Sequence, residues 1–125
     1  MKPARLSGVD LQRSIKMYLT ANHHFGKQHE ASKEVLGMEF LGRTDEYAER
    51  VIRDAVSALQ LSGEPIVSNT DTGGYYYPET EEEFLEYMAD NQKRIDALTA
   101  KRAAMYQGWH RRTKRVISPL QERLI

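Results

Sequence analysis

The sequence predicts a mainly α-helical protein with a small β-hairpin, followed by a long C-terminal helix. Three observations predict this class. Apolar residues recur at three- and four-residue intervals in several segments of the 125-residue chain, as on the buried stripe of an amphipathic helix. Two short β-prone runs, 66–68 and 75–77, flank a stretch rich in turn formers. After residue 80, a helical apolar spacing continues to about residue 107.

Two helices are predicted in the first third of the chain. One apolar stripe comprises Leu11, Ile15, Tyr18 and Leu19, and the turn-forming segment 22–26 ends that helix. A second, shorter helix is expected from the N-cap Ser32 to Leu41, with Gly42 after it in a conformation of positive φ. Gly37 weakens this second prediction, because glycine costs about 1 kcal/mol inside a helix.

A third helix is predicted from Thr44 to the segment 62–65, where Pro65 cannot continue it. Its expected buried face consists of Tyr47, Val51, Ala55, Ala58 and Leu59, with Ile52 and Val56 beside it. The other face carries Glu46, Arg50, Arg53, Ser57 and Gln60. This helix therefore presents two arginines and two neutral polar side chains to solvent.

The hairpin is predicted to join 66–68 to 75–77 through the turn residues 69–74. In a strand, Tyr75 and Tyr77 face one side and Tyr76 faces the other. This alternation favours packing of the tyrosines in the core over stacking on unpaired bases.

The last helix is predicted to begin at a capping box formed by Thr80 and Glu83. Its apolar positions are Phe84, Met88, Ile95, Leu98 and Met105. Their spacing is that of a heptad repeat, and Asn91 lies on the same stripe, where a polar residue can fix the register of a two-stranded coil. We therefore expect either a homodimer through the helix 84–105 or an ordinary amphipathic helix that covers its own domain.

The hairpin region also carries a family resemblance. The segment 58–68, ALQLSGEPIVS, is followed by GGYYY at 73–77 and ETEEE at 79–83. This pattern resembles a winged helix-turn-helix domain and is most similar to small phage and prophage winged-helix DNA-binding proteins. The resemblance implies a winged helix-turn-helix domain at 1–78 with its wing at about 66–77, a long C-terminal helix at 79–107 and a basic tail at 108–125.

The resemblance also implies a function and its residues. The third helix of such a domain enters the major groove of double-stranded DNA. The residues facing that groove would be Arg50, Arg53, Ser57 and Gln60. Arg43 would hold a phosphate, and the wing would make contact through Asn69, Thr70, Thr72 and the backbone near Gly73 and Gly74. Further phosphate contacts would come from Lys101, Arg102, Arg111, Arg112, Lys114 and Arg115.

The charge distribution leaves an alternative open. Eighteen basic and 18 acidic residues give a formal net charge of zero, whereas nucleic-acid-binding domains tend to be basic. By segment, residues 1–43 carry +3, 44–63 carry −2, 64–99 carry −7 and 100–125 carry +6. Four carboxylates lie on the third helix, so Arg50 and Arg53 can simply pair with Glu46, Glu49 or Asp54. The alternative to a phage-type regulator or replication or recombination accessory is therefore a protein–protein adaptor or homodimerisation module without DNA affinity.

Other classes of protein are disfavoured. The chain has no cysteine, which excludes disulfides, cysteine-ligated zinc and a thiol nucleophile. The four histidines lack a metal-binding spacing, and no residues form a nucleophile–base pair. We thus expect no enzymatic activity, metal, cofactor or small-molecule substrate. The short apolar runs and the lack of a signal-peptide pattern at residues 1–6 predict a cytoplasmic protein that does not enter a membrane.

Overall fold

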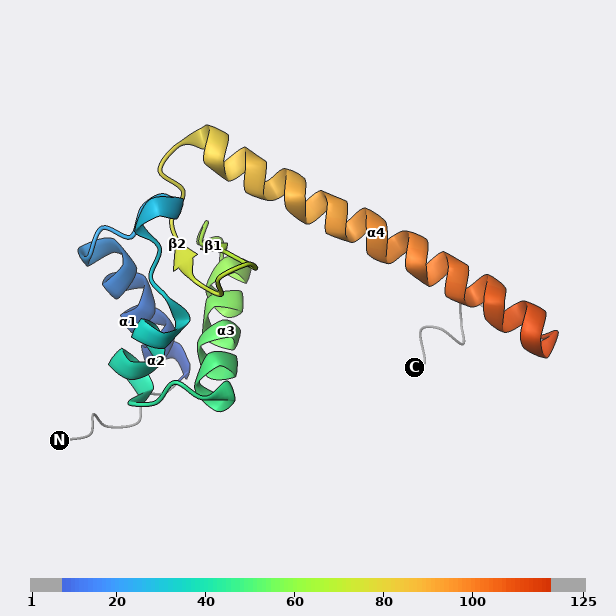
Figure 1. The fold of residues 1–125 in the computed structure, drawn as a ribbon, viewed down its shortest axis with the longest axis horizontal. Helices are drawn as coiled ribbons and strands as arrows, with labels where there is room; N and C mark the ends of the chain where they lie inside the picture. The colour runs from blue at the N-terminus through green and yellow to red at the C-terminus, as the bar shows by residue number, and fades with distance from the viewer. Residues whose placement is uncertain (1–7, 118–125) are drawn as a thin grey trace. The chain divides into compact units, whose positions relative to one another are not determined.

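A computed structural model describes residues 8–117, and its helical elements account for most of them (Figure 1). The elements are α1 (Gly8–Ala21), the 3₁₀ turn η1 (Lys27–His29), α2 (Lys33–Leu41), α3 (Glu46–Leu61), β1 (Val67–Ser68), β2 (Tyr75–Tyr76) and α4 (Glu81–Thr113). The predicted class, mainly α with one hairpin, is confirmed. The chain divides into two compact units, Met1–Leu85 and Glu86–Ile125. The predicted domain and tail extend to residues 1–7 and 118–125, which lie outside the described residues.

The core of the first unit forms where α1 and α2 pack against α3 beside the hairpin (Figure 1). Its buried members include Leu11, Ile15 and Leu19 of α1, Leu36 of α2, Ile52, Val56 and Leu59 of α3, and Tyr75 and Tyr77. The stripe predicted for α1 is thus confirmed. Burial of each large aliphatic side chain contributes roughly 1.5–3 kcal/mol relative to exposure, so the three helices depend on one another.

The buried face of α3 differs from the prediction. Tyr47 is 38% exposed, whereas Ala48 and Ile52 are buried at 1% and 0% exposure. Two overlapping stripes fit the sequence of this helix, because positions 47, 51 and 55 and positions 48, 52 and 55 both follow helical spacing. Packing against α1 and α2 selects the second stripe and leaves Tyr47 at the surface. The helix is capped by Asp45, whose Oδ1 accepts a hydrogen bond from Ala48 N at 3.1 Å.

The hairpin also pairs with the connection between α1 and α2. Val67 opposes Tyr76 and Ser68 opposes Tyr75 in the antiparallel β1–β2 pair. On the other edge of β2, Tyr75 N donates to Ala31 O at 2.9 Å, and Ala31 N donates to Tyr75 O at 2.8 Å. This added pairing was not predicted. All three tyrosines at 75–77 are buried, which confirms their predicted place in the core.

Helix α4 begins as predicted and ends later than predicted. Thr80 Oγ1 accepts from Glu83 N at 3.1 Å, while the Glu83 carboxylate accepts from Glu79 N. The helix continues through Thr113, so residues 108–113 are helical and are not part of a tail that begins at 108. The glycine at position 108 lowers the stability of the helix by only about 1 kcal/mol. The residues after it are compatible with a helix and offset this cost. No residue of α4 is buried.

Gly37 shapes the turn between α2 and α3. A Cβ atom at this position would lie 2.5 Å from the carbonyl oxygen of Arg43. The chain reverses at Gly42, whose φ of 67° is left-handed, and this brings the Arg43 carbonyl onto α2. The glycine that weakens the helix in the sequence therefore provides the space for the turn.

We predict that Gly37→Ala lowers the free energy of unfolding of the first unit by about 1–3 kcal/mol, the cost of overpacking. Helix propensity alone predicts the opposite sign, a gain of up to about 1 kcal/mol. Urea unfolding followed by near-ultraviolet circular dichroism of the buried tyrosines measures the change. Gly8→Ala is the matched control, because a Cβ there has no described atom within 4 Å apart from its chain neighbours and its own helix backbone. A Gly37→Ala variant as stable as this control would contradict the steric explanation.

Glu64 connects α1 to the end of the hairpin. Its Oε1 lies 2.5 Å from Lys16 Nζ, and its Oε2 accepts a hydrogen bond from the Tyr77 hydroxyl at 3.0 Å. The hydrogen bond from Lys16, and to a lesser degree the one from Tyr77, lowers the pKa of Glu64. Burial, followed by the bond to Glu64, raises the pKa of Tyr77. Both groups therefore hold their usual protonation states at neutral pH.

The lowered pKa of Glu64 makes stability depend on pH. Because the folded-state pKa lies below the unfolded value of about 4.3, the stabilisation is present above that value and is lost as the pH falls through the folded pKa. We predict that Glu64→Gln lowers the free energy of unfolding at neutral pH and flattens its decline toward about pH 3. Chemical unfolding at both pH values tests this. Parallel pH dependences of the wild type and the variant would contradict it.

Candidate nucleic-acid interface

The outer face of α3 carries three of the predicted contact residues. Arg50, Arg53 and Ser57 are all exposed. Within residues 8–117, neither arginine has a carboxylate oxygen within ion-pair distance, so the alternative, pairing with neighbouring acids, is not seen. The Arg50 guanidinium instead lies 5.8 Å from the centroid of the Tyr47 ring, a cation–π distance. Both guanidinium groups can thus still donate hydrogen bonds to a phosphate or a base edge.

Two carboxylates of the α3 region are paired with cations from outside the helix. Glu49 Oε1 lies 3.1 Å from Lys33 Nζ of α2. Asp45 is paired with Arg43, from the turn before α3. These pairs offset two of the four negative charges that oppose a nucleic acid at this helix.

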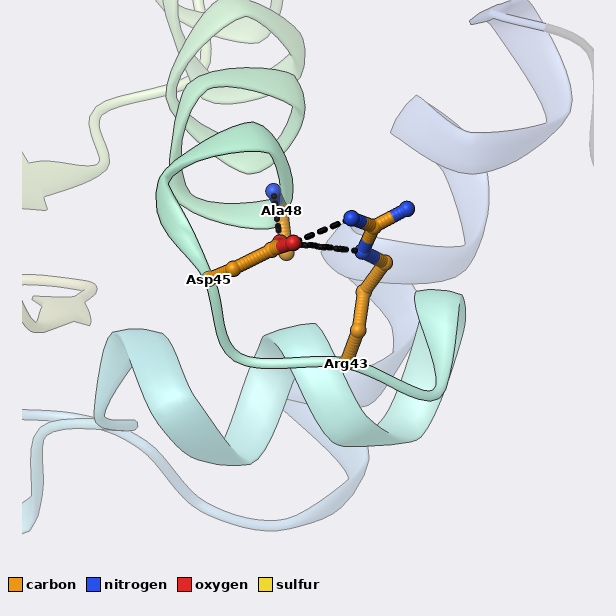
Figure 2. Close-up of polar contacts among 3 residues, drawn as sticks. All are labelled: Arg43, Asp45 and Ala48. Atoms are coloured by element: carbon orange, nitrogen blue, oxygen red, sulfur yellow. Dashed lines mark hydrogen bonds and ion pairs between the residues drawn. The ribbon is translucent and has the colours of Figure 1, made fainter.

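Figure 2 shows the pair at the start of α3, where the Arg43 guanidinium is turned toward the Asp45 carboxylate. Arg43 Nε donates to Asp45 Oδ1 at 2.9 Å and to Oδ2 at 3.0 Å, and its Nη2 also contacts Oδ2. The hydrogen bonds from Arg43, and then that from Ala48 N, lower the pKa of Asp45. Arg43, predicted as a phosphate contact, is thus already bound to the capping residue of α3.

A pocket of about 310 Å³ lies between α3, the start of α2 and the hairpin loop. It is lined by Lys33, Glu49, Arg53, Ser68, Asn69, Thr70, Gly73 and Tyr75. The pocket brings Arg53 together with the predicted wing residues, although the two segments are well separated in sequence. Lys33, which no sequence pattern indicates, joins them because the Ala31–Tyr75 pairing draws the start of α2 toward the loop.

The hairpin loop is held by its own polar groups. Asn69 Nδ2 donates to Glu30 Oε2 at 3.0 Å, and Asn69 Oδ1 accepts from Asp71 N. The amide of Gly73 donates to Asn69 O, and that of Gly74 donates to Thr72 Oγ1. The amides of Gly73 and Gly74, which are expected to contact DNA, thus already donate hydrogen bonds within the loop. The side chains of Thr70 and Thr72 are exposed.

Gln60 points to the hairpin and is only partly exposed. Its Nε2 donates to Ile66 O at 2.7 Å and lies 3.4 Å from Ser68 Oγ. The side chain thus joins the last turns of α3 to the strand that follows. Its amide is used inside the unit, in contrast to the exposed Ser57 one turn earlier.

The predicted C-terminal phosphate contacts lie in the second unit. Lys101 and Arg102 are exposed on α4, and the Arg102 guanidinium is 5.9 Å from the Tyr106 ring centroid. Arg111 and Arg112 belong to the last turn of α4, where cations interact favourably with the helix dipole. Lys114 and Arg115 follow the end of the helix and are exposed.

Three of the four histidines, His23, His24 and His29, line a second pocket of about 500 Å³ together with Glu30 and Glu79. His24 Nδ1 lies 2.7 Å from His29 O. Among residues 8–117, no three ligand-type side chains are arranged to hold a metal ion. No helix in the same part of the chain combines the length and the apolar character required to cross a bilayer.

Comparison with protein-family models, with curated proteins and with solved structures found no match to this chain.

We predict that Gln60→Ala lowers the free energy of unfolding by about 1–2 kcal/mol, because the Ile66 carbonyl loses its hydrogen-bond donor. Ser57→Ala, on the exposed face of the same helix, is expected to change it by no more than about 0.5 kcal/mol. Urea unfolding of the two variants makes the comparison. Equal free energies of unfolding for the two variants would show that the Gln60 hydrogen bond makes no net contribution to stability.

Proposed function

We propose that this protein binds double-stranded DNA through α3 and the hairpin loop of a winged helix-turn-helix domain at residues 8–78. The observation that carries the proposal is the pair of exposed arginines, Arg50 and Arg53, beside a loop that shares a pocket with Arg53. Phosphate charge dominates the affinity of proteins for DNA. Exposed guanidinium groups on one helix face supply both charge and bidentate donors.

The order of the elements supports the winged helix-turn-helix assignment. Helix α1 leads to a short extended segment at Ala31, then to α2, α3 and the hairpin. The Ala31 segment pairs with β2 and adds a third extended stretch to the hairpin. In such domains the third helix lies in the major groove, and its exposed residues reach base edges.

The ion pairs around α3 also favour DNA binding. Lys33 offsets Glu49 and Arg43 offsets Asp45, so the unpaired arginines are not opposed by the full acidic charge of the helix. Within this proposal, Arg50 and Arg53 contact guanine edges or phosphates and Ser57 adds a polar contact. Thr70 and Thr72 contact the backbone from the loop. Gln60 is left out, because its amide binds Ile66.

A salt series tests the proposal. We expect measurable binding to random-sequence duplex DNA whose logarithm falls linearly with the logarithm of salt concentration. Arg50→Ala combined with Arg53→Ala should weaken binding by about tenfold or more, and should reduce the slope by about 0.9 for each lost phosphate contact. Fluorescence anisotropy of labelled DNA provides both quantities.

The matched control is Arg13→Ala combined with Lys27→Ala, which removes the same charge from exposed positions outside α3 and the loop. This control should retain the wild-type slope. Equal losses in the two double variants would assign the effect to net charge alone. No binding to any duplex at low salt would reject the proposal and favour a protein–protein adaptor on the same scaffold.

A further inference from the structure

One stripe runs along the whole of α4. Its members, at alternating intervals of four and three residues from Phe84, are Phe84, Met88, Asn91, Ile95, Leu98, Arg102, Met105 and Trp109. We call them the α4 stripe. The intervals are those of the a and d positions of a heptad repeat, on which two helices pack knobs into holes.

Five of the six apolar members of the α4 stripe are exposed to solvent, and the sixth, Phe84, is partly buried. Met88, Ile95, Leu98, Met105 and Trp109 are between 46% and 66% exposed. Single exposed apolar residues are common on proteins, but apolar side chains repeated along one face of a helix mark a surface that binds another helix. Covering these side chains is favourable by about 25 cal/mol for each Å² of apolar area removed from water.

The α4 stripe has the same order of residue types on both sides of a centre between Asp96 and Ala97, counted outward from that centre. Ile95 mirrors Leu98, Asn91 mirrors Arg102, Met88 mirrors Met105 and Phe84 mirrors Trp109. Any heptad spacing is symmetric, but the matching of aliphatic, polar, thioether and aromatic types is not required by the spacing. From this we infer that α4 pairs with α4 of a second copy of the chain in antiparallel orientation, centred between Asp96 and Ala97.

The charges at the ends of α4 favour the same orientation. One step beyond the α4 stripe lie Glu81 at the start of the helix and Arg112 in its last turn. In the antiparallel pair, Glu81 faces Arg112 of the partner subunit, once at each end. The acidic first turn, Glu81 to Glu83, thus lies beside the basic last turn of the other helix.

A parallel pair in register is disfavoured by the same side chains. It would place Arg102 against Arg102 of the partner subunit inside the seam, and Glu81 and Arg112 against their own copies. Like charges in a partly desolvated seam are costly. In the antiparallel pair, Arg102 instead meets Asn91 of the partner subunit, whose side-chain oxygen can accept its hydrogen bonds.

The residues on either side of the α4 stripe are compatible with an antiparallel pair. Leu85 approaches Tyr106 of the partner subunit, which extends the apolar area on one flank. On the other flank, Arg94 approaches Lys101 of the partner subunit. Both are long side chains at the solvent edge, where repulsion is screened and small.

This dimer is independent of the DNA contacts proposed for α3. It assigns Arg102 and Arg112 to the seam between subunits and leaves Lys101, Arg111, Lys114 and Arg115 off the α4 stripe. Its test is made without DNA.

Disulfide trapping tests the orientation, because the natural chain has no cysteine. Full-length Met88→Cys and Met105→Cys proteins are prepared separately, mixed and oxidised with copper phenanthroline. We expect a disulfide dimer in the mixture and little in either protein alone. In the antiparallel pair, the two copies of residue 88 lie about 25 Å apart along the axis at 1.5 Å per residue, too far for a disulfide. Met88→Cys mixed with Ala104→Cys, which lies off the stripe, is the matched control.

Sedimentation equilibrium gives the second measurement. We expect a dimer mass for the wild type and a monomer mass for Leu98→Glu, which places a carboxylate against Ile95 of the partner subunit. Glu81→Arg should weaken the dimer, and adding Arg112→Glu to it should restore the affinity. A wild-type monomer at every concentration would overturn the inference, and so would a disulfide dimer of Met88→Cys alone, which is the signature of a parallel pair.

Discussion

The close approach of the Arg43 carbonyl to Gly37 is the constraint on which the first unit depends. It fixes where the chain leaves α2 and enters α3. The position of α3 in turn determines that Ile52 enters the core while Tyr47 stays at the surface. Arg50 and Arg53 point outward for the same reason. A single missing methyl group therefore governs both the packing of the core and the surface that is proposed to meet DNA.

Local signals in the sequence were sufficient for most of the elements. Ser32 and Gly42 marked the ends of α2, and Thr80 marked the start of α4. They were not sufficient for the rotation of α3, because its sequence carries two overlapping stripes and the choice between them is made by helices distant in sequence. The pairing of Ala31 with Tyr75 could not be predicted from sequence either, because one extended residue leaves no periodic pattern.

The candidate site also has some features that follow from local sequence and others that follow from the structure around them. The exposure of Arg50, Arg53 and Ser57 follows from helical periodicity, whereas the partners of Arg43 and Gln60 follow from the turns around them. Lys33 could not be selected from sequence, because only the tertiary structure brings it to Glu49.

The ion pairs of the first unit affect how its charge is distributed over the surface. Residues 8–78 contain 7 basic and 10 acidic side chains, a net charge of −3. The exposed Arg43–Asp45 pair adds little to stability, and the Lys33–Glu49 pair is partly buried. Their effect is on the distribution of charge, since they mask acids beside α3 and leave Arg50 and Arg53 unmasked. A net charge summed over a domain does not describe the face that a ligand would meet.

The place of Trp109 has a spectroscopic consequence. It is the only tryptophan of the chain, and it lies half-exposed on α4, outside the core of the first unit. Indole emission recorded on the whole protein therefore reports the surroundings of one turn of one helix. The core around Ile15, Leu36 and Ile52 contains no indole, and its folding has to be followed through other signals.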